Sequence, residues 1–158
     1  MQPKARTFGI AFTIYDANQQ EAFKVEGQKL SWSRKVSLMN LDGLVLVFIR
    51  QRPMSWHSRY EIYRQQQLAA TVTQKLTFSG RQFRVRVPGQ EDFRVQGSFT
   101  GCEFTFERGG HQVARASKKL WAWNGRYGIE IADGEDDLLI LATSVVLDLI
   151  RRDSNLYS

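Results

Sequence analysis

The sequence predicts an all-β domain with one buried helix, namely a closed antiparallel barrel of about twelve strands around a C-terminal hydrophobic helix. Three observations predict it: an internal repeat of alternating segments, hairpin-type turns, and one long apolar run after the last strand. With 158 residues, 42% of them hydrophobic, the chain is long enough for one packed core. We therefore predict a single domain over residues 1–158, with barrel strands over about 8–132 and the helix over about 136–150.

The repeat consists of segments in which apolar and polar residues alternate, as they do in half-buried strands. The segments begin at Phe12, Val36, Tyr60, Phe83, Phe104 and Tyr127, with spacings of 24, 24, 23, 21 and 23 residues. Each is followed by a polar turn and a second extended segment, as at 22–25. Units this short leave no room for a crossover helix, so the strands are predicted to be antiparallel. Six such units give about eleven or twelve strands, and closure removes the exposed edges of so long a sheet.

The turns within the units carry hairpin chemistry. Residues 16–18, 40–43, 88–90 and 109–110 contain Asp, Asn, Pro and Gly. Gly, Asn and Asp tolerate the positive φ angles of tight hairpins, so these positions are predicted to join paired neighbours.

The helix is predicted from residues 138–150, of which ten of thirteen are apolar and lie all round a helical wheel. A helix of this kind is buried on every side, and it is shorter than the roughly 20 residues of a membrane span. The acidic residues at 135–137 and the pair Arg151-Arg152 are predicted to complement the dipole at its two ends. Asp148 leaves two alternatives: a carboxylate at the barrel mouth that is solvated or bonded to backbone, or a buried acid with a designated partner. The cost of burying a charge favours the first.

Four segments resemble the LURP-one-related family. They are Tyr60-Glu-Ile-Tyr-Arg, Leu68-Ala-Ala-Thr-Val, Gln74-Lys-Leu and, most specifically, the stretch from Tyr127 to Ala142, which includes Ala-Asp-Gly-Glu-Asp-Asp before the apolar helix. The resemblance covers roughly residues 8–152. It implies the tubby C-terminal-like fold, a twelve-stranded barrel around a central hydrophobic helix. Tubby relatives bind phosphoinositides through basic side chains, but the resemblance assigns those ligands to no particular position here.

Charge is predicted to divide between the two ends of the barrel, because successive connections in an antiparallel meander alternate between ends. The junctions between units hold eleven Lys and Arg against one acid; they are 29–35, 50–59, 75–81, 97–103 and 118–126. The turns within units hold ten acids against two arginines; they are 16–21, 40–43, 64–67, 88–92, 107–111 and 133–137. We call the end that carries the junctions between units the basic end, and the end that carries the turns within units the acidic end.

The basic end supplies the candidate site. The predicted ligands for an anionic headgroup are Arg34, Lys35, Arg59, Arg81 and Arg126, and the predicted interface aromatics are Trp32, Trp56, Trp121 and Trp123. Trp beside Arg suits a membrane interface, and equally the stacking and phosphate contacts of nucleic acid. A third interpretation is that the aromatic side chains only plug the barrel end.

These features predict a non-enzymatic binding module with no cofactor and no metal, because no catalytic or metal-binding constellation occurs. The two histidines, His57 and His111, fall at opposite ends of the barrel. The net charge of +6 favours anionic partners, and the lone Cys102 favours a reducing compartment. We predict a cytoplasmic monomer, attached peripherally to anionic phospholipid or phosphoinositide. The alternatives are a protein-interaction domain without a lipid ligand and a nucleic-acid or transcription-linked binder.

Overall fold

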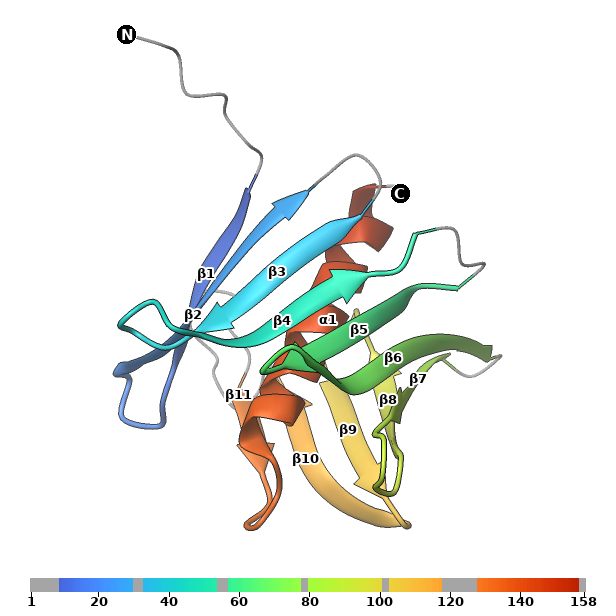
Figure 1. The fold of residues 1–158 in the computed structure, drawn as a ribbon. Coiled ribbons are helices and arrows are strands. Elements are labelled where there is room, and N and C mark those ends of the chain that lie inside the picture. The colour runs from blue at the N-terminus through green and yellow to red at the C-terminus, as the bar shows by residue number, and fades with distance from the viewer. Residues whose placement is uncertain are drawn as a thin grey trace, which may run out of the picture.

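The computed structural model describes residues 9–29, 33–53, 57–77, 80–100, 103–117 and 128–156. These residues form one antiparallel sheet of eleven strands and one helix, and the strand order in the sheet follows the chain (Figure 1). The strands are β1 Gly9–Tyr15, β2 Glu21–Lys29, β3 Arg34–Met39, β4 Val45–Gln51, β5 Arg59–Arg64, β6 Gln67–Thr77, β7 Gly80–Arg86, β8 Phe93–Ser98, β9 Glu103–Arg108, β10 His111–Ser117 and β11 Gly128–Ile131. The helix is α1 Asp137–Leu156. The predicted β meander with one C-terminal helix is confirmed.

The turns at the acidic end hold the hairpins in register. Gly43, Gly89 and Gly110 have φ angles of 86°, 75° and 78°, as their sequence context predicts. The turn between β5 and β6 is different, because its two central residues are Gln65 and Gln66, with φ of 48° and 63°. Positive φ at both central positions is the type I′ geometry, which Asn-Gly satisfies with less strain than Gln-Gln.

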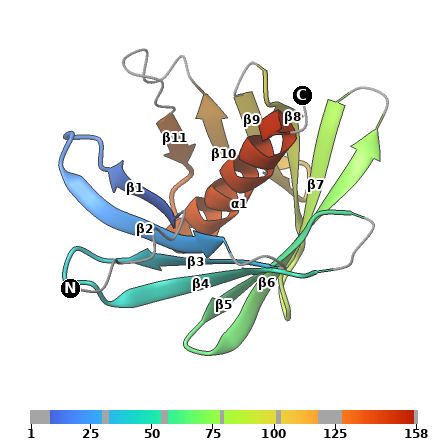
Figure 2. The same ribbon diagram turned by 90° about the horizontal axis from the view of Figure 1, so that it is seen from above.

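The core lies between the concave face of the sheet and α1. Every residue from 139 to 150 is buried, so no face of this stretch of the helix is freely exposed, although the sheet that curls around it is open between β1 and β11 (Figure 2). Alternate side chains of the strands point toward it, as Val36 and Leu38 of β3 and Val47 and Ile49 of β4 do, each at most 1% exposed. Burying a side chain of this size contributes roughly 1.5–3 kcal/mol, so the contact between helix and sheet dominates stability.

The start of α1 is fixed by the acidic run that precedes it. The Asp136 carboxylate accepts a hydrogen bond from the backbone N–H of Leu139 at 3.2 Å, which is N-cap geometry. Arg64 forms an ion pair with Asp136, and Arg108 forms one with Glu135 at 2.5 Å. The acidic residues therefore cap the helix and hold it to the turns of the sheet.

The end of α1 differs from the prediction. The helix continues to Leu156, beyond the predicted residue 150, so Arg151 and Arg152 lie within it and its last turn carries no basic residue. Asp153 and Ser154 in the added turn contact arginines of the sheet. Those contacts stabilise a polar turn that hydrophobic periodicity does not reveal.

The sheet is open in the described part of the chain. β1 pairs only with β2 and β11 pairs only with β10, and the two strands form the free edges of the curled sheet (Figure 2). Both are odd-numbered members of an antiparallel meander, so they run in the same direction. The predicted closure therefore remains a prediction.

Candidate anion-binding surface at the basic end

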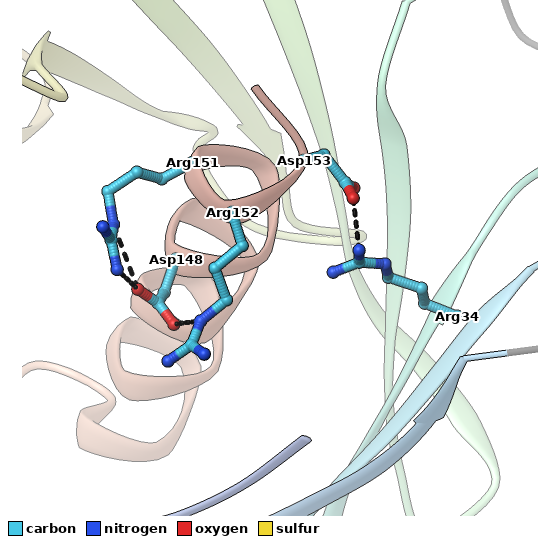
Figure 3. Close-up of polar contacts among 5 residues, drawn as sticks. All are labelled: Arg34, Asp148, Arg151, Arg152 and Asp153. Atoms are coloured by element: carbon cyan, nitrogen blue, oxygen red, sulfur yellow. Dashed lines mark hydrogen bonds and ion pairs between the residues drawn. The ribbon is translucent and has the colours of Figure 1, made fainter. Parts of the chain in front are cut away.

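The structure describes four of the nine residues predicted for the site: Arg34, Lys35, Arg59 and Arg81. Arg126 and the four tryptophans lie outside the described residues, so their predicted roles stay predictions. The topology does place the described junctions at one end, together with the C-terminal end of α1 (Figure 1). Arg34 contacts Asp153 of the helix there (Figure 3), and Arg81 contacts Ser154.

Arg34 points into the protein. It shares the inward face of β3 with Val36 and Leu38, and its side chain is only 6% exposed. Its guanidinium donates a hydrogen bond to the carboxylate of Asp153 near the end of α1 (Figure 3). A headgroup cannot reach a guanidinium buried in this way, so the structure assigns Arg34 to helix anchoring.

Arg81 has a similar position on β7, with the same parity as the buried Phe83. Its Nη1 donates to the hydroxyl of Ser154 at 3.0 Å, and its guanidinium carbon lies 4.4 Å from the centre of the Phe99 ring. The hydrogen bond ties β7 to the last turns of the helix, and the cation–π contact holds the guanidinium against Phe99, which follows β8. Strand alternation in the sequence indicates that these two side chains point inward, because Arg34 and Arg81 fall at the positions that alternate with apolar residues in their strands.

Tyr60 completes the buried contact region around the end of the helix. The residue is fully buried, and burial, reinforced by the nearby negative charge of Asp153, raises the pKa of its phenol far above the usual value. Within the described residues, the Tyr60 hydroxyl and Nη1 of Arg34 are buried without a hydrogen-bond partner. The phenol therefore stays neutral at physiological pH beside the ion pair of Arg34 and Asp153.

The side chains of Lys35 and Arg59 point away from the helix. Both are exposed on the convex face of the sheet, near the junction ends of β3 and β5. Arg50 and Arg52, on and just after β4, share this face. Lys35 lies opposite Arg50 in the ladder, and the backbone N–H of Arg52 donates to the carbonyl of Arg59 at 2.9 Å. We call these four side chains the outer basic cluster.

A single carboxylate organises the cluster. Glu61 lies opposite Arg50 on β5; its side chain is 9% exposed. It accepts hydrogen bonds from Arg50 Nη2 and from the Tyr63 hydroxyl, both at 2.7 Å, and Arg52 Nε lies 3.5 Å away. The Arg50 guanidinium also lies 5.5 Å from the centre of the Tyr63 ring.

These contacts set the charge states of the cluster. Burial alone would raise the pKa of Glu61, but the hydrogen bonds from Arg50 and Tyr63 and the charge of Arg52 outweigh it and lower the pKa. The hydrogen bond to Glu61 raises the pKa of Arg50 and that of Tyr63. Glu61 is thus an anion that restrains two arginines, and four cations around one carboxylate leave the surface positive. Sequence reasoning missed Glu61, although its position two residues after Arg59 on an alternating strand puts it on the same face.

At the acidic end, three of the ten carboxylates, all of which the structure describes, form ion pairs with arginine. Besides the two pairs at the start of α1, Asp92 accepts hydrogen bonds from Arg84 at 2.9 and 3.1 Å. At the basic end, by contrast, Lys35 and Arg59 make no ion pair within the described part of the chain. Their charges therefore remain available to a ligand.

The structure supports the second alternative for Asp148, namely a buried acid with a designated partner. Its side chain is 5% exposed, and its two oxygens accept hydrogen bonds from Arg151 Nη2 at 2.7 Å and Arg152 Nε at 2.6 Å (Figure 3). The acid is buried and has two designated partners on its own helix. Its spacing of three and four residues from the arginines places all three on one face.

The fold and this surface define a class of protein: an antiparallel sheet curled around a buried C-terminal helix, with a cationic cluster on its convex face. In the described ranges, no three His, Cys, Asp or Glu residues are grouped so that they could hold a metal ion, and α1 is not apolar enough over sufficient length to cross a membrane.

The chain belongs to the LURP-one-related family, whose sequence profile matches residues 1–148. It is 35% identical over 150 residues to the uncharacterized protein YxjI of Bacillus subtilis, a match that covers 95% of this chain and 91% of that protein. No solved structure matches the chain.

Proposed function

We propose that this protein is a non-enzymatic module that binds anionic phospholipid headgroups, phosphoinositides among them, through the outer basic cluster. The observation that supports the proposal is the pairing pattern. Lys35 and Arg59 are exposed without an acidic partner in the described residues, while Arg50 and Arg52 are held beside them by Glu61. Pre-oriented guanidinium groups suit phosphate, because their fork of N–H donors matches its oxygens.

Reversible, peripheral attachment follows from the size of the cluster. Each basic residue near an anionic leaflet contributes about 1 kcal/mol. Four such residues give roughly 4 kcal/mol, which corresponds to a dissociation constant near the millimolar range. A specific headgroup or a second contact is then needed for tight binding, and the predicted tryptophans of the junctions would supply the second. We place the protein in the cytoplasm, where the anionic leaflet lies and where a lone cysteine stays reduced.

The test is co-sedimentation with vesicles at physiological salt. Phosphatidylcholine vesicles are compared with vesicles that also contain phosphatidylserine or phosphatidylinositol bisphosphate. The double variant Lys35→Gln with Arg59→Gln loses about 2 kcal/mol of attraction, so its dissociation constant rises roughly 30-fold. The matched control is Arg94→Gln with Arg115→Gln, which removes two exposed charges from β8 and β10. Because these lie opposite Glu107 and Glu130 on neighbouring strands, we expect a change within about threefold.

Two results count against the lipid site. Equal losses in the two double variants would show attraction by net charge alone, and no binding to any vesicle would eliminate the lipid ligand. Single-stranded DNA is included as a competitor, because displacement with a steep salt dependence and no headgroup preference would indicate nucleic acid instead.

We further propose that the sheet closes into the predicted barrel of about twelve strands. Eleven antiparallel strands leave β1 and β11 running in the same direction, so direct pairing of the two edges would create a parallel ladder. One additional strand, antiparallel to both, would complete the sheet with antiparallel ladders throughout and remove both edges.

A further inference from the structure

β4 is apolar on both of its faces. Residues 44–49 read Leu-Val-Leu-Val-Phe-Ile, six apolar residues in succession. Such a run is typical of strands that are buried on both faces, whereas strands with one face in water alternate. Val47 and Ile49 meet the core, and Phe48 between them points to the convex side of the sheet. The convex face of β4 therefore carries apolar surface that α1 does not cover (Figure 2).

Two β-bulges enlarge this surface. On β4 the register shifts so that Val45 lies opposite Met39, and on β6 it shifts so that Leu68 lies opposite Tyr63. Ladder partners share a face, and Val45 and Leu68 are 50% and 40% exposed. Phe48 lies opposite Tyr63, and their ring centres are 6.4 Å apart. We call Met39, Val45, Phe48, Tyr63 and Leu68 the outer apolar patch.

The patch is made entirely of residues that the structure describes. Every turn at the acidic end is described, and the ranges that are not described adjoin strand or helix ends at the basic end. Among the described residues, the large apolar side chains with at least 40% exposure are Leu41, Leu44, Val45 and Leu68. All four lie in or just after the turns that precede β4 and β6. Exposed apolar surface is thus concentrated in one region, which is typical of an interaction site.

The patch is continuous with the outer basic cluster. Arg50 follows Phe48 on the convex face of β4, and its guanidinium carbon lies 5.5 Å from the centre of the Tyr63 ring. The Tyr63 hydroxyl donates to Glu61, the carboxylate that also pairs with Arg50 and Arg52. On the same strands, apolar side chains therefore occupy the half toward the acidic end, and cations occupy the half toward the basic end.

We propose that the convex face of β3–β6 lies along an anionic leaflet, with the outer basic cluster at the phosphates and the outer apolar patch at the boundary between headgroups and acyl chains. Tyr63 joins the two regions, because its ring belongs to the patch and its hydroxyl to the cluster, an arrangement that suits a membrane interface. The strands then run along the leaflet, and the acidic turns point parallel to it. The inference rests on the proposed function and adds the orientation and a second contact.

A bilayer suits this surface for two reasons. The face is convex, and a leaflet yields to a protruding surface. The leaflet also presents phosphates and apolar chains at adjacent depths, which matches a patch that is continuous with cations. Arginine and lysine side chains reach across those depths, because their stems cover apolar surface while their charged heads stay at the phosphates.

The test places an environment-sensitive fluorophore at single cysteines of the full chain, in a background in which the lone cysteine is replaced by Cys102→Ser. Three exposed positions carry it: Leu68→Cys in the patch, Thr100→Cys at the basic end and Gln90→Cys in the turn between β7 and β8. Vesicles contain phosphatidylcholine alone or with phosphatidylserine, and a nitroxide-labelled acyl chain serves as quencher. Only the fluorophore at position 68 should shift to the blue and lose intensity, and only on vesicles with phosphatidylserine.

The apolar contact has its own variant. Val45→Thr with Leu68→Gln removes apolar surface at two exposed positions and should raise the dissociation constant for phosphatidylserine vesicles about tenfold. Because no charge changes, this variant should keep the native dependence of binding on salt, whereas Lys35→Gln with Arg59→Gln should show a weaker dependence. Urea unfolding of the patch variant should match that of the native protein, since both positions are exposed.

The possible results separate this orientation from the lipid function itself. Sedimentation with phosphatidylserine vesicles without quenching at position 68, or with quenching at position 100 instead, would overturn the orientation and leave the lipid function standing. Native affinity of the patch variant would likewise exclude the apolar contact. No binding to any vesicle would overturn both proposals. A blue shift at position 68 without vesicles, together with a doubled mass in solution, would show that a second copy covers the patch instead of a leaflet.

Discussion

Replacing Asp148 by asparagine removes one buried charge from the middle of α1 while keeping the volume of the side chain. In the native protein the carboxylate is 5% exposed and holds Arg151 and Arg152, whose side chains are 32% and 47% exposed. The substitution leaves two adjacent guanidinium groups beside a neutral amide that can no longer compensate their charge.

The size of the effect follows from that partial burial. Breaking a fully buried ion pair costs about 3–5 kcal/mol, whereas an exposed pair contributes about 0–1 kcal/mol. One partner here is buried and the other two are partly exposed, so we expect the free energy of unfolding to fall by about 2–3 kcal/mol. For a chain of this length, each kcal/mol lowers Tm by roughly 2–4 °C.

The assay is urea and thermal unfolding followed by circular dichroism, at low salt and at high salt. High salt should reduce the difference between variant and native protein, because the solvent-facing parts of both arginines are screened. Asp133→Asn serves as the control, since Asp133 is exposed in the turn before α1 and should change stability by less than about 0.5 kcal/mol. An equally small loss for Asp148→Asn would refute the reasoning, because it would mean that the carboxylate is effectively solvated.

Three further predictions concern the sheet. Gly97→Ala should prevent stable folding or cost several kcal/mol, because a Cβ there would lie 2.0 Å from the carbonyl oxygen of Glu103 on β9, and urea unfolding measures the loss. The comparison variant is Gly89→Ala, which has open space around it and should cost only the roughly 1–2 kcal/mol of placing a side chain at a φ of 75°. The double substitution Gln65→Asn with Gln66→Gly should raise stability by about 1 kcal/mol and Tm by roughly 2–4 °C, because it relieves positive φ in the turn between β5 and β6. Glu61 should stabilise the fold relative to Glu61→Gln, because its pKa is lower in the folded protein than its ordinary value of 4.5. This contribution should be fully present above pH 4.5 and should be lost as pH falls through the lowered pKa of the folded state. Urea unfolding at a series of pH values measures it.

For each of these three predictions, one result would contradict the reasoning. Equal stability of Gly97→Ala and Gly89→Ala would show that β8 and β9 can separate at that position. A turn variant no more stable than the native chain would show that Gln65 and Gln66 carry little strain. A difference between Glu61 and Glu61→Gln that does not vary with pH would show that the carboxylate gains nothing from Arg50 in the folded state.

The fold was largely predictable because hydrophobic alternation and turn chemistry act locally. The phase of Val36 and Leu38 predicts both the strand and the face that meets the helix, and the all-round apolar run predicts that α1 is enclosed. The final turn of α1 was not predictable, because Asp153 and Ser154 are held by Arg34 and Arg81 from strands that are distant in sequence.

The candidate site was predictable in part. The division of charge between the two ends follows from topology alone, and Lys35 and Arg59 are exposed as the site requires. Arg34 and Arg81 point toward the helix instead, and the charge count did not reveal this because it does not distinguish the two faces of a strand. Glu61 was overlooked because its effect depends on Arg50, a cross-strand neighbour that ladder register identifies and sequence spacing does not.

The position of α1 after every described strand has a consequence for synthesis of the protein. Chains emerge N-terminus first, at about 5–20 residues per second, so the strands leave the ribosome before the helix that covers their apolar face. Neighbouring strands can pair early, since each hairpin is local, but the concave surface stays open to water and to other nascent chains until α1 arrives. Nascent chains halted within β11 should therefore be bound by chaperones or aggregate, and release of residues 137–156 should mark the point at which the sheet becomes protected.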